Sequence, residues 1–234
     1  MDELIPKISW ADFRSRFHWK QQEHMALMAP PGAGKTTLFL HLAPLRRYVI
    51  VFGTKARDPL YEKLLRNGYR RIQSIDEIRP WDEKLLLWPQ ILSKGMTIPK
   101  AINLQREVFK EALDQIMLQG GWAVNIDESK YCAEMLGLRK EITFAIEQLR
   151  SNNNTIICGA QRPSWIPPSV LAHSTHVFLW KTTDRNDQIK LADIGGIDAK
   201  LVRSQAMTLG AHEFIYIKTR GTESLMVRSE VGRR

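Results

Sequence analysis

The sequence predicts an α/β fold, in which a mostly parallel central sheet carries helices on both faces and is followed by a C-terminal β-hairpin. Three observations predict it. Short apolar runs alternate with helical stretches, which is typical of a parallel sheet covered by helices. A glycine-rich turn joins one apolar run directly to a helix. Two β-rich runs, 213–219 and 224–228, flank Arg220-Gly221-Thr222, as in a hairpin.

The strands are predicted at short apolar runs. The run 48–53, Tyr-Val-Ile-Val-Phe-Gly, is almost wholly apolar, as expected of a central parallel strand that is buried on both faces. The run 84–88 fits either a strand or a helix. The other predicted strands are 24–29, 70–73, 122–126, 155–160 and 176–181.

Helices are predicted where apolar residues recur every three or four positions. Short helices are expected at 35–42 and 59–65, a long one at 100–118, and a second long one that ends at the polar run 151–154. The buried face of the first long helix is predicted to consist of Ala101, Leu104, Val108, Ala112 and Ile116. That of the second is predicted to consist of Met135, Leu138, Ile142, Ala145, Ile146 and Leu149.

Composition sets broad limits on the function. The 234 residues are 44% hydrophobic and 25% charged, which argues against a disordered or fibrous chain. Two cysteines, Cys132 and Cys158, exclude a disulfide scaffold and a four-cysteine zinc site, and we expect buried free thiols. The net charge of +9 favours a polyanionic partner. Because the chain shows neither a signal peptide nor an apolar run near the ~18 residues that span a bilayer, we expect a cytoplasmic protein without membrane insertion.

The segment 29–37, Ala-Pro-Pro-Gly-Ala-Gly-Lys-Thr-Thr, matches the phosphate-binding loop pattern except that Ala29 replaces its first glycine. Glycines let backbone N–H groups close on phosphate oxygens, and the following helix N-terminus favours the anion. Lys35 is expected to reach the β- and γ-phosphates of ATP, Thr36 to bind Mg²⁺, and Thr37 to touch the α-phosphate. The expected nucleotide-binding residues are Pro31, Gly32, Ala33, Gly34, Lys35, Thr36 and Thr37.

The strand predicted at 122–126 ends in Asp127-Glu128. Such a pair is also common as a solvated strand end, but beside a phosphate loop it favours catalysis. Asp127 is then expected to hold the Mg²⁺ shell, and Glu128 to orient and deprotonate the attacking water. The sequence lacks the Asn-Lys-x-Asp of guanine recognition and a clear arginine-rich lid, so it favours ATP hydrolysis over GTP hydrolysis or phosphate transfer to a small molecule.

Gln161 follows the strand predicted at 155–160, where it could sense the γ-phosphate or simply bond to the strand end. The phrase Ala-Gln-Arg-Pro-Ser at 160–164 resembles the sensor segment of the FtsK/HerA superfamily of DNA-translocating P-loop ATPases, which have a RecA/FtsK-like fold. The similarity continues through the strand at 175–180, the polar turn 184–187 and Ile194-Gly195-Gly196. It covers about residues 25–198 and is weak from 54 to 121.

The resemblance implies an arginine finger. Members of this superfamily carry an Arg at the end of the helix before the sensor strand, where it reaches the neighbouring subunit's nucleotide. The matching residue is Arg150, which could instead stabilise the helix C-terminus. The reserve candidates are Arg139, Arg162 and Arg185.

The resemblance also implies a function. The short chain is similar to phage and viral genome-packaging ATPases, so we expect a motor that translocates double-stranded DNA as a homo-oligomeric ring, hexameric or pentameric, in the host cytoplasm if viral. A portal or capsid vertex protein is a possible further partner. The alternatives are an ATPase that powers secretion or extrusion, or another DNA transaction, and a nucleotide-dependent assembly switch without turnover.

The predicted organisation is one ATPase domain, 1–234, with an N-terminal packing segment (1–22), an ATPase core (23–207) and a C-terminal hairpin with a basic tail (208–234). We expect the aromatic residues of the first segment to pack on the domain rather than stack on bases. They are Trp10, Phe13, Phe17 and Trp19. The candidate contacts to DNA phosphates are Lys55, Arg57, Arg66, Arg70, Arg71 and the loop 94–100. The six histidines show no metal-ligand spacing.

Overall fold

The computed structural model describes residues 5–194, 198–220 and 225–232, without the side chains of Leu149 and Arg150. Four features predicted from the sequence lie outside the described residues. They are Gly195-Gly196, the hairpin turn around Gly221-Thr222, the terminal Arg233-Arg234 and the side chain of the predicted finger, Arg150.

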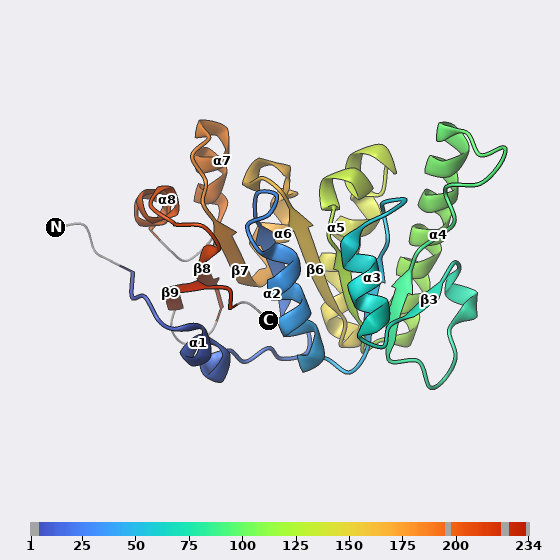
Figure 1. The fold of residues 1–234 in the computed structure, drawn as a ribbon, viewed down its shortest axis with the longest axis horizontal. Helices are drawn as coiled ribbons and strands as arrows, with labels where there is room; N and C mark the ends of the chain where they lie inside the picture. The colour runs from blue at the N-terminus through green and yellow to red at the C-terminus, as the bar shows by residue number, and fades with distance from the viewer. Residues whose placement is uncertain (1–4, 195–197, 221–224, 233–234) are drawn as a thin grey trace.

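The described strands form one nine-stranded sheet in the order β3-β4-β2-β5-β6-β1-β7-β8-β9 (Figure 1). Neighbours from β3 to β7 are parallel, whereas β7, β8 and β9 pair antiparallel. This confirms the predicted fold class with its C-terminal hairpin, and the ambiguous run 84–88 forms a strand. The strands are β1 (His24–Met28), β2 (Val49–Phe52), β3 (Arg70–Ile72), β4 (Lys84–Leu87), β5 (Ala123–Ile126), β6 (Thr155–Ala160), β7 (Ser174–Trp180), β8 (Glu213–Lys218) and β9 (Leu225–Glu230).

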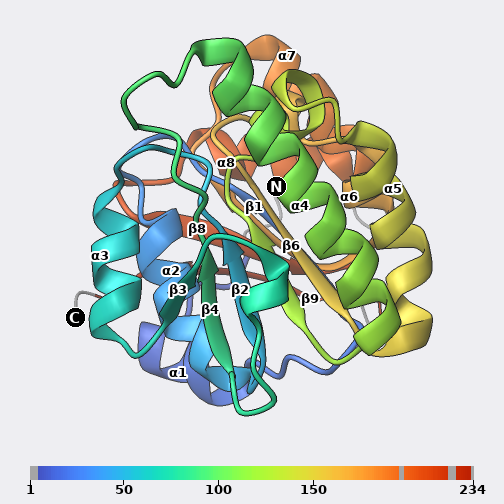
Figure 2. The same ribbon diagram turned by 90° about the vertical axis from the view of Figure 1, so that its right-hand side faces the viewer.

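Helices cover both faces of the sheet (Figure 2). The α-helices are α1 (Trp10–Arg16), α2 (Lys35–Leu42), α3 (Pro59–Arg66), α4 (Ile98–Gln119), α5 (Arg139–Gln148), α6 (Pro168–His173), α7 (Arg185–Lys190) and α8 (Ala199–Met207). Helices α1, α2 and α3 lie on one face, and α4, α5 and α6 on the other. The strands are therefore apolar on both sides: in β2, Val49 and Val51 enter one core, and Ile50 and Phe52 the other. Within the described ranges, no helix combines the length and apolar composition needed to cross a bilayer.

The buried face of α4 is rotated from the prediction. It consists of Gln105, Phe109, Ala112, Leu113 and Ile116, of which only Ala112 and Ile116 were predicted. Leu104 is exposed, whereas the neighbouring Gln105 is fully buried. The Gln105 amide donates to the Thr54 carbonyl (2.9 Å), and its oxygen accepts from the Tyr131 hydroxyl (2.6 Å). A pattern of apolar residues alone misses Gln105, because its polar side chain is buried only through these two hydrogen bonds.

The second long helix is interrupted, which corrects the prediction. A single π-turn at Tyr131–Met135 comes first, Gly137 then adopts a left-handed φ of 67°, and α5 begins at Arg139. As a result, Met135 is 58% exposed, while the predicted core residues of α5 itself are buried. The predicted polar turn 184–187 is also helical, because Asp184 caps the N-terminus of α7.

The two outer strands of the sheet are short or partly covered. At one edge, β3 has only three residues, and the Arg70 guanidinium is bound to the Asp82 carboxylate. At the other edge, the segment 6–8 hydrogen-bonds to Arg228 of β9 through its backbone (2.8 and 2.9 Å). The N-terminal aromatics pack as predicted, with the Phe13 ring 5.2 Å from that of Phe214.

Both cysteines are buried free thiols, as predicted. Burial raises the pKa of the Cys132 thiol well above its usual range, and it raises the pKa of Cys158 to about 12. Both groups therefore remain protonated and unreactive near neutral pH.

Candidate nucleotide site

Three neighbouring parallel strands bring the predicted site residues to one edge of the sheet. Strand β6 lies between β5 and β1, with Ile126 opposite Cys158 and Met28 opposite Ala160. The phosphate loop follows β1, Asp127-Glu128 follows β5, and Gln161 follows β6. Because the carboxyl ends of parallel strands meet at one edge, residues far apart in the sequence line one cavity.

The phosphate loop has the backbone that its glycines permit. Gly32 and Gly34 have φ values of 76° and 112°, a region that side chains rarely adopt, and Gly34 is the N-cap of α2 without a side-chain partner for the helix amides. The first helical N–H groups are thus directed at the loop, where an anion is favoured. Ala29 takes the place of the usual first glycine without strain, because it continues β1 and donates its N–H to Ala160 (3.1 Å).

Lys35 begins α2, and its side chain is buried beneath the loop. Its ammonium group lies 3.0 Å from the Asp127 backbone oxygen and 3.2 Å from the Asp127 carboxylate. The same contacts fix the end of β5 against the phosphate loop. Lys35 and Asp127 therefore form a fixed pair at the phosphate loop.

Gly159 allows the close approach of β5 and β6 at the site. A Cβ at Gly159 would lie 2.6 Å from the Asp127 backbone oxygen and 3.1 Å from its carboxylate. Ser129, two residues after Asp127, donates its hydroxyl to the Gly159 carbonyl (2.9 Å). The sequence analysis did not identify Gly159, although an isolated glycine inside an apolar strand is the usual sign of such an approach.

Glu128 has two side-chain partners. The Gln161 amide lies 3.4 Å from its carboxylate, and the Lys55 ammonium group lies 3.0 Å from the same oxygen. Lys55 also pairs with Asp58 (2.9 Å). Burial opposes the charge on Lys55, but hydrogen bonds to Asp58 and Glu128 outweigh it and raise the Lys55 pKa. Lys55, which the sequence suggested as a DNA contact, thus lies in this cavity.

The cavity has a volume of about 300 Å³. It is lined by Ala29, Pro30, Pro31, Gly32, Gly34, Lys35, Thr36, Thr37, Lys55, Asp58, Asp127, Glu128 and Gln161. Of the loop residues predicted to bind nucleotide, only Ala33 is missing from this lining, and its carbonyl accepts a hydrogen bond from His212 (3.3 Å). Thr36 and Asp127 offer a hydroxyl and a carboxylate oxygen, the ligand types that Mg²⁺ prefers, so this donor set fits the predicted metal.

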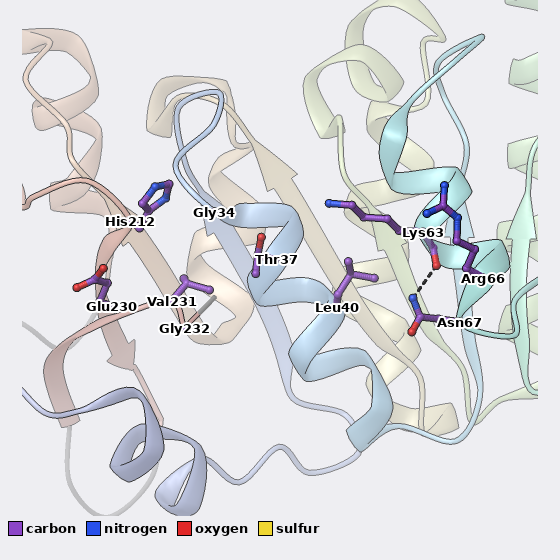
Figure 3. A pocket seen from close by; sticks show the side chains of 10 residues that line it. All are labelled: Gly34, Thr37, Leu40, Lys63, Arg66, Asn67, His212, Glu230, Val231 and Gly232. Carbon is purple, nitrogen blue, oxygen red and sulfur yellow. Dashed lines mark hydrogen bonds between the residues drawn. The ribbon is translucent and has the colours of Figure 1, made fainter. Parts of the chain in front are cut away.

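A second cavity of about 600 Å³ adjoins the first, because Gly34 and Thr37 line both. Figure 3 shows it in front of α2, with Lys63, Arg66 and Asn67 of the α3 segment on one side and His212, Val231 and Gly232 on the other. The Lys63 side chain extends toward α2 in this view. The second cavity therefore continues the phosphate site along the outer face of the helix.

The structure places the backbone of Arg150 away from its own cavity. Arg150 belongs to the 3-10 turn Leu149–Asn152, just before β6 begins, whereas Gln161 follows the end of β6. Six strand residues at ~3.3 Å each separate the two ends by roughly 20 Å. An interaction between Arg150 and phosphates would therefore have to involve another copy of the chain.

The other arginines suggested as fingers or DNA contacts have intramolecular partners or lie outside the cavity. Arg162 pairs with Asp184 (2.7 Å) and Asp187 (2.9 Å). Arg139 lies 3.5 Å from Glu134, and Arg185 is the exposed first residue of α7. Arg66 pairs with Glu62 (3.3 Å), and Arg71 stacks on Trp88 at 4.3 Å. The two lysines of the loop 94–100 and Arg57 are exposed.

The parallel sheet, the phosphate loop and the acidic strand end together define a P-loop ATPase architecture. The fold is similar to that of B204, the DNA-packaging ATPase from Sulfolobus turreted icosahedral virus, with a TM-score of 0.64 and 14% identity over 89% of this chain and 98% of that one. The genome-packaging NTPase B204 of Sulfolobus turreted icosahedral virus 2, in complex with ATP-gammaS, gives a TM-score of 0.61 at 13% identity over 89% and 98%.

VirB4 of Thermoanaerobacter pseudethanolicus also has this fold, with a TM-score of 0.61 and 10% identity over 90% of each chain. These similarities confirm the predicted fold, a mostly parallel sheet with helices on both faces. No protein-family model matches the sequence, and no curated protein matches it either.

Proposed function

We propose that this chain is an ATP-hydrolysing motor that moves double-stranded DNA, that it works as a ring of identical subunits, and that it serves viral or phage genome packaging. One observation carries the proposal: Lys35, Asp127, Glu128 and Gln161 line the cavity that the phosphate loop forms. The similarity to packaging ATPases of nearly the same length supports the biological process.

The residues divide the reaction among them. Backbone N–H groups of the loop and the Lys35 ammonium group bind the β- and γ-phosphates of ATP. Thr36 and Asp127 would hold Mg²⁺, which would supply positive charge against the phosphates. Glu128 accepts a proton from water as the water oxygen bonds to the γ-phosphorus. The bond from that phosphorus to the bridging oxygen breaks, and ADP and phosphate leave. Gln161, beside Glu128, is placed to position the same water.

The charge in the cavity supports a cation supplied by a neighbouring subunit. Among the described lining residues, the carboxylates Asp58, Asp127 and Glu128 face only two ammonium groups, Lys35 and Lys55. Bound Mg·ATP adds further negative charge, which grows on the γ-phosphoryl oxygens in the transition state. A guanidinium such as that of Arg150 would meet this need only across a subunit interface, which makes turnover depend on assembly.

Duplex DNA provides the test. A motor that grips phosphates should hydrolyse ATP several-fold faster with added duplex, and the stimulation should fall steeply between about 50 and about 200 mM salt, because phosphate contacts release counterions. The measurement is steady-state phosphate release with duplex DNA of unrelated sequences, with a neutral polymer as control. Turnover that ignores DNA at every salt concentration would contradict the proposed function.

A second candidate is an ATPase that drives secretion or conjugative transfer. The fold similarity also includes the pCW3 conjugation coupling protein TcpA (TM-score 0.51, 10% identity, 91% of this chain and 61% of that one). DNA stimulation would favour the DNA-handling functions. Stimulation by a protein partner alone would favour secretion.

A further inference from the structure

Lys55 emerges at the same edge of the sheet as the catalytic candidates. It follows β2, and β2 pairs directly with β5, with Val51 opposite Asn125. The segment after β2 therefore runs beside Asp127-Glu128, and the Lys55 side chain lines the phosphate cavity. The Lys55 side chain therefore reaches the cavity without any change in the backbone.

The backbone around Lys55 is fixed from three directions. The Tyr61 hydroxyl accepts from the Lys55 N–H (3.0 Å), the Trp88 indole donates to its carbonyl (2.9 Å), and the Gln105 amide donates to the preceding carbonyl of Thr54 (2.9 Å). Gly53 has no room for a side chain, because a Cβ would lie 2.9 Å from Trp88. This anchoring holds the Lys55 ammonium group at the cavity, although the side chain is 43% exposed.

The partners of Lys55 define what it can do. Its ammonium group holds the carboxylate that the proposed function assigns as the base, at 3.0 Å, and Asp58 at 2.9 Å. A carboxylate engaged by an ammonium ion is a poorer proton acceptor than a free one. A terminal phosphate with its negative charge is a stronger attractant for that ammonium ion than one carboxylate. The contact of Lys55 with Glu128 and its proposed contact with the γ-phosphate lie close together, because Glu128 must be within reach of a water beside that phosphate.

We propose that Lys55 is a catalytic residue that contacts the γ-phosphate of bound ATP, and that this contact releases Glu128 to accept the proton of the attacking water. The inference rests on the proposed ATPase function. Lys55 then distinguishes ATP from ADP. With ADP bound, the Lys55 ammonium group stays paired with Glu128, whereas with ATP bound it pairs with the γ-phosphate. Glu128 is then released from Lys55 only when ATP occupies the site.

The test compares the affinities for Mg²⁺ with a non-hydrolysable β,γ-methylene ATP analogue and with ADP, by calorimetry, in full-length protein. Lys55→Met should weaken binding of the triphosphate about tenfold or more and change ADP affinity less than about threefold, because one charge-assisted contact is lost only with the triphosphate. ATP turnover should also fall, and Lys55→Arg should restore part of the triphosphate preference. Lys110→Met, an exposed lysine on α4, is the matched control and should keep both affinities.

A preserved ratio of triphosphate to ADP affinity in Lys55→Met would overturn the inference, whether both affinities stay or both fall together. Lys55→Gln is measured beside it, so that a folded variant is available if the Met variant fails to fold. The two proposals fail differently. Wild-type protein that binds neither nucleotide would refute the ATPase function, whereas wild-type protein that hydrolyses ATP alongside an unchanged ratio in the variants would refute only the role of Lys55.

Discussion

Glu128 illustrates how a single side chain depends on its surroundings for its role. Its carboxylate lies between the Gln161 amide and the Lys55 ammonium group and is only 16% exposed, so water screens it less than a carboxylate on an open surface. Asp127, one residue earlier, instead pairs with Lys35. The two adjacent acids thus have different partners, which fits the proposed roles of Asp127 as a Mg²⁺ ligand and of Glu128 as the proton acceptor.

At the residue scale, Glu128→Gln should lower ATP turnover by about 10²- to 10⁴-fold, because an amide of the same size cannot accept the proton. Nucleotide affinity should persist, since the phosphate loop and Lys35 are untouched. Phosphate release and equilibrium binding of ADP measure the two effects separately. Glu111→Gln, an exposed glutamate on α4, serves as the control. Full turnover in Glu128→Gln would show that another group acts as the base.

At the scale of elements, the site depends on how closely β5 approaches β6. Gly159 is the contact point, and no side chain fits between it and Asp127. The hydroxyl of Ser129 joins the same two segments from the other side. The close approach of β6 therefore helps to set the positions of Asp127 and Glu128, together with the Lys35 contacts to Asp127.

We expect Gly159→Ala to displace Asp127, lower the free energy of unfolding by about 1–3 kcal/mol and reduce turnover about tenfold or more. Gly68→Ala is a useful comparison, because Gly68 has a positive φ (84°) and open space around it. That variant should lose stability through backbone strain but keep its turnover per folded molecule. Thermal unfolding and turnover of both proteins test this, and equal turnover in the two would argue against the strand contact.

The sequence predicted those elements whose signal is local. The phosphate loop carries its own glycines and lysine, and the apolar strands are buried on both faces, so both could be predicted without knowing the strand order. Lys55 could not, because its place beside Glu128, 73 residues further along the sequence, depends on β2 pairing with β5. A signal was nevertheless present: Lys55, like Asp127 and Gln161, is a polar residue just after an apolar strand. The break at Gly137 was missed because apolar spacing continues on both sides of it.

At the scale of the whole molecule, the turn containing Arg150 and the phosphate cavity lie at opposite ends of β6. In the proposed ring, the turn of one subunit would have to approach the cavity of the next. Complementation between two inactive variants is therefore the direct readout of the proposed assembly.

Arg150→Ala should reduce turnover about 10³-fold or more while leaving ADP binding intact, as expected of a finger supplied in trans. Mixing this variant with Glu128→Gln should restore measurable turnover, because some interfaces then combine an intact Arg150 with an intact Glu128. A mixture of Lys35→Ala and Glu128→Gln should stay inactive, since each subunit lacks a residue of its own cavity. No recovery in the first mixture, with both variants still assembling by mass measurement, would contradict the trans role.

The covered edges of the sheet have a consequence for such an assembly. With β3 only three residues long and the segment 6–8 laid along β9, the described sheet offers little free ladder on which a second copy could extend it. Contacts between subunits of the proposed ring would then consist of side chains and loops. Interfaces of that kind can shift without breaking a continuous sheet between subunits. A motor that changes conformation in each cycle of ATP hydrolysis needs this freedom.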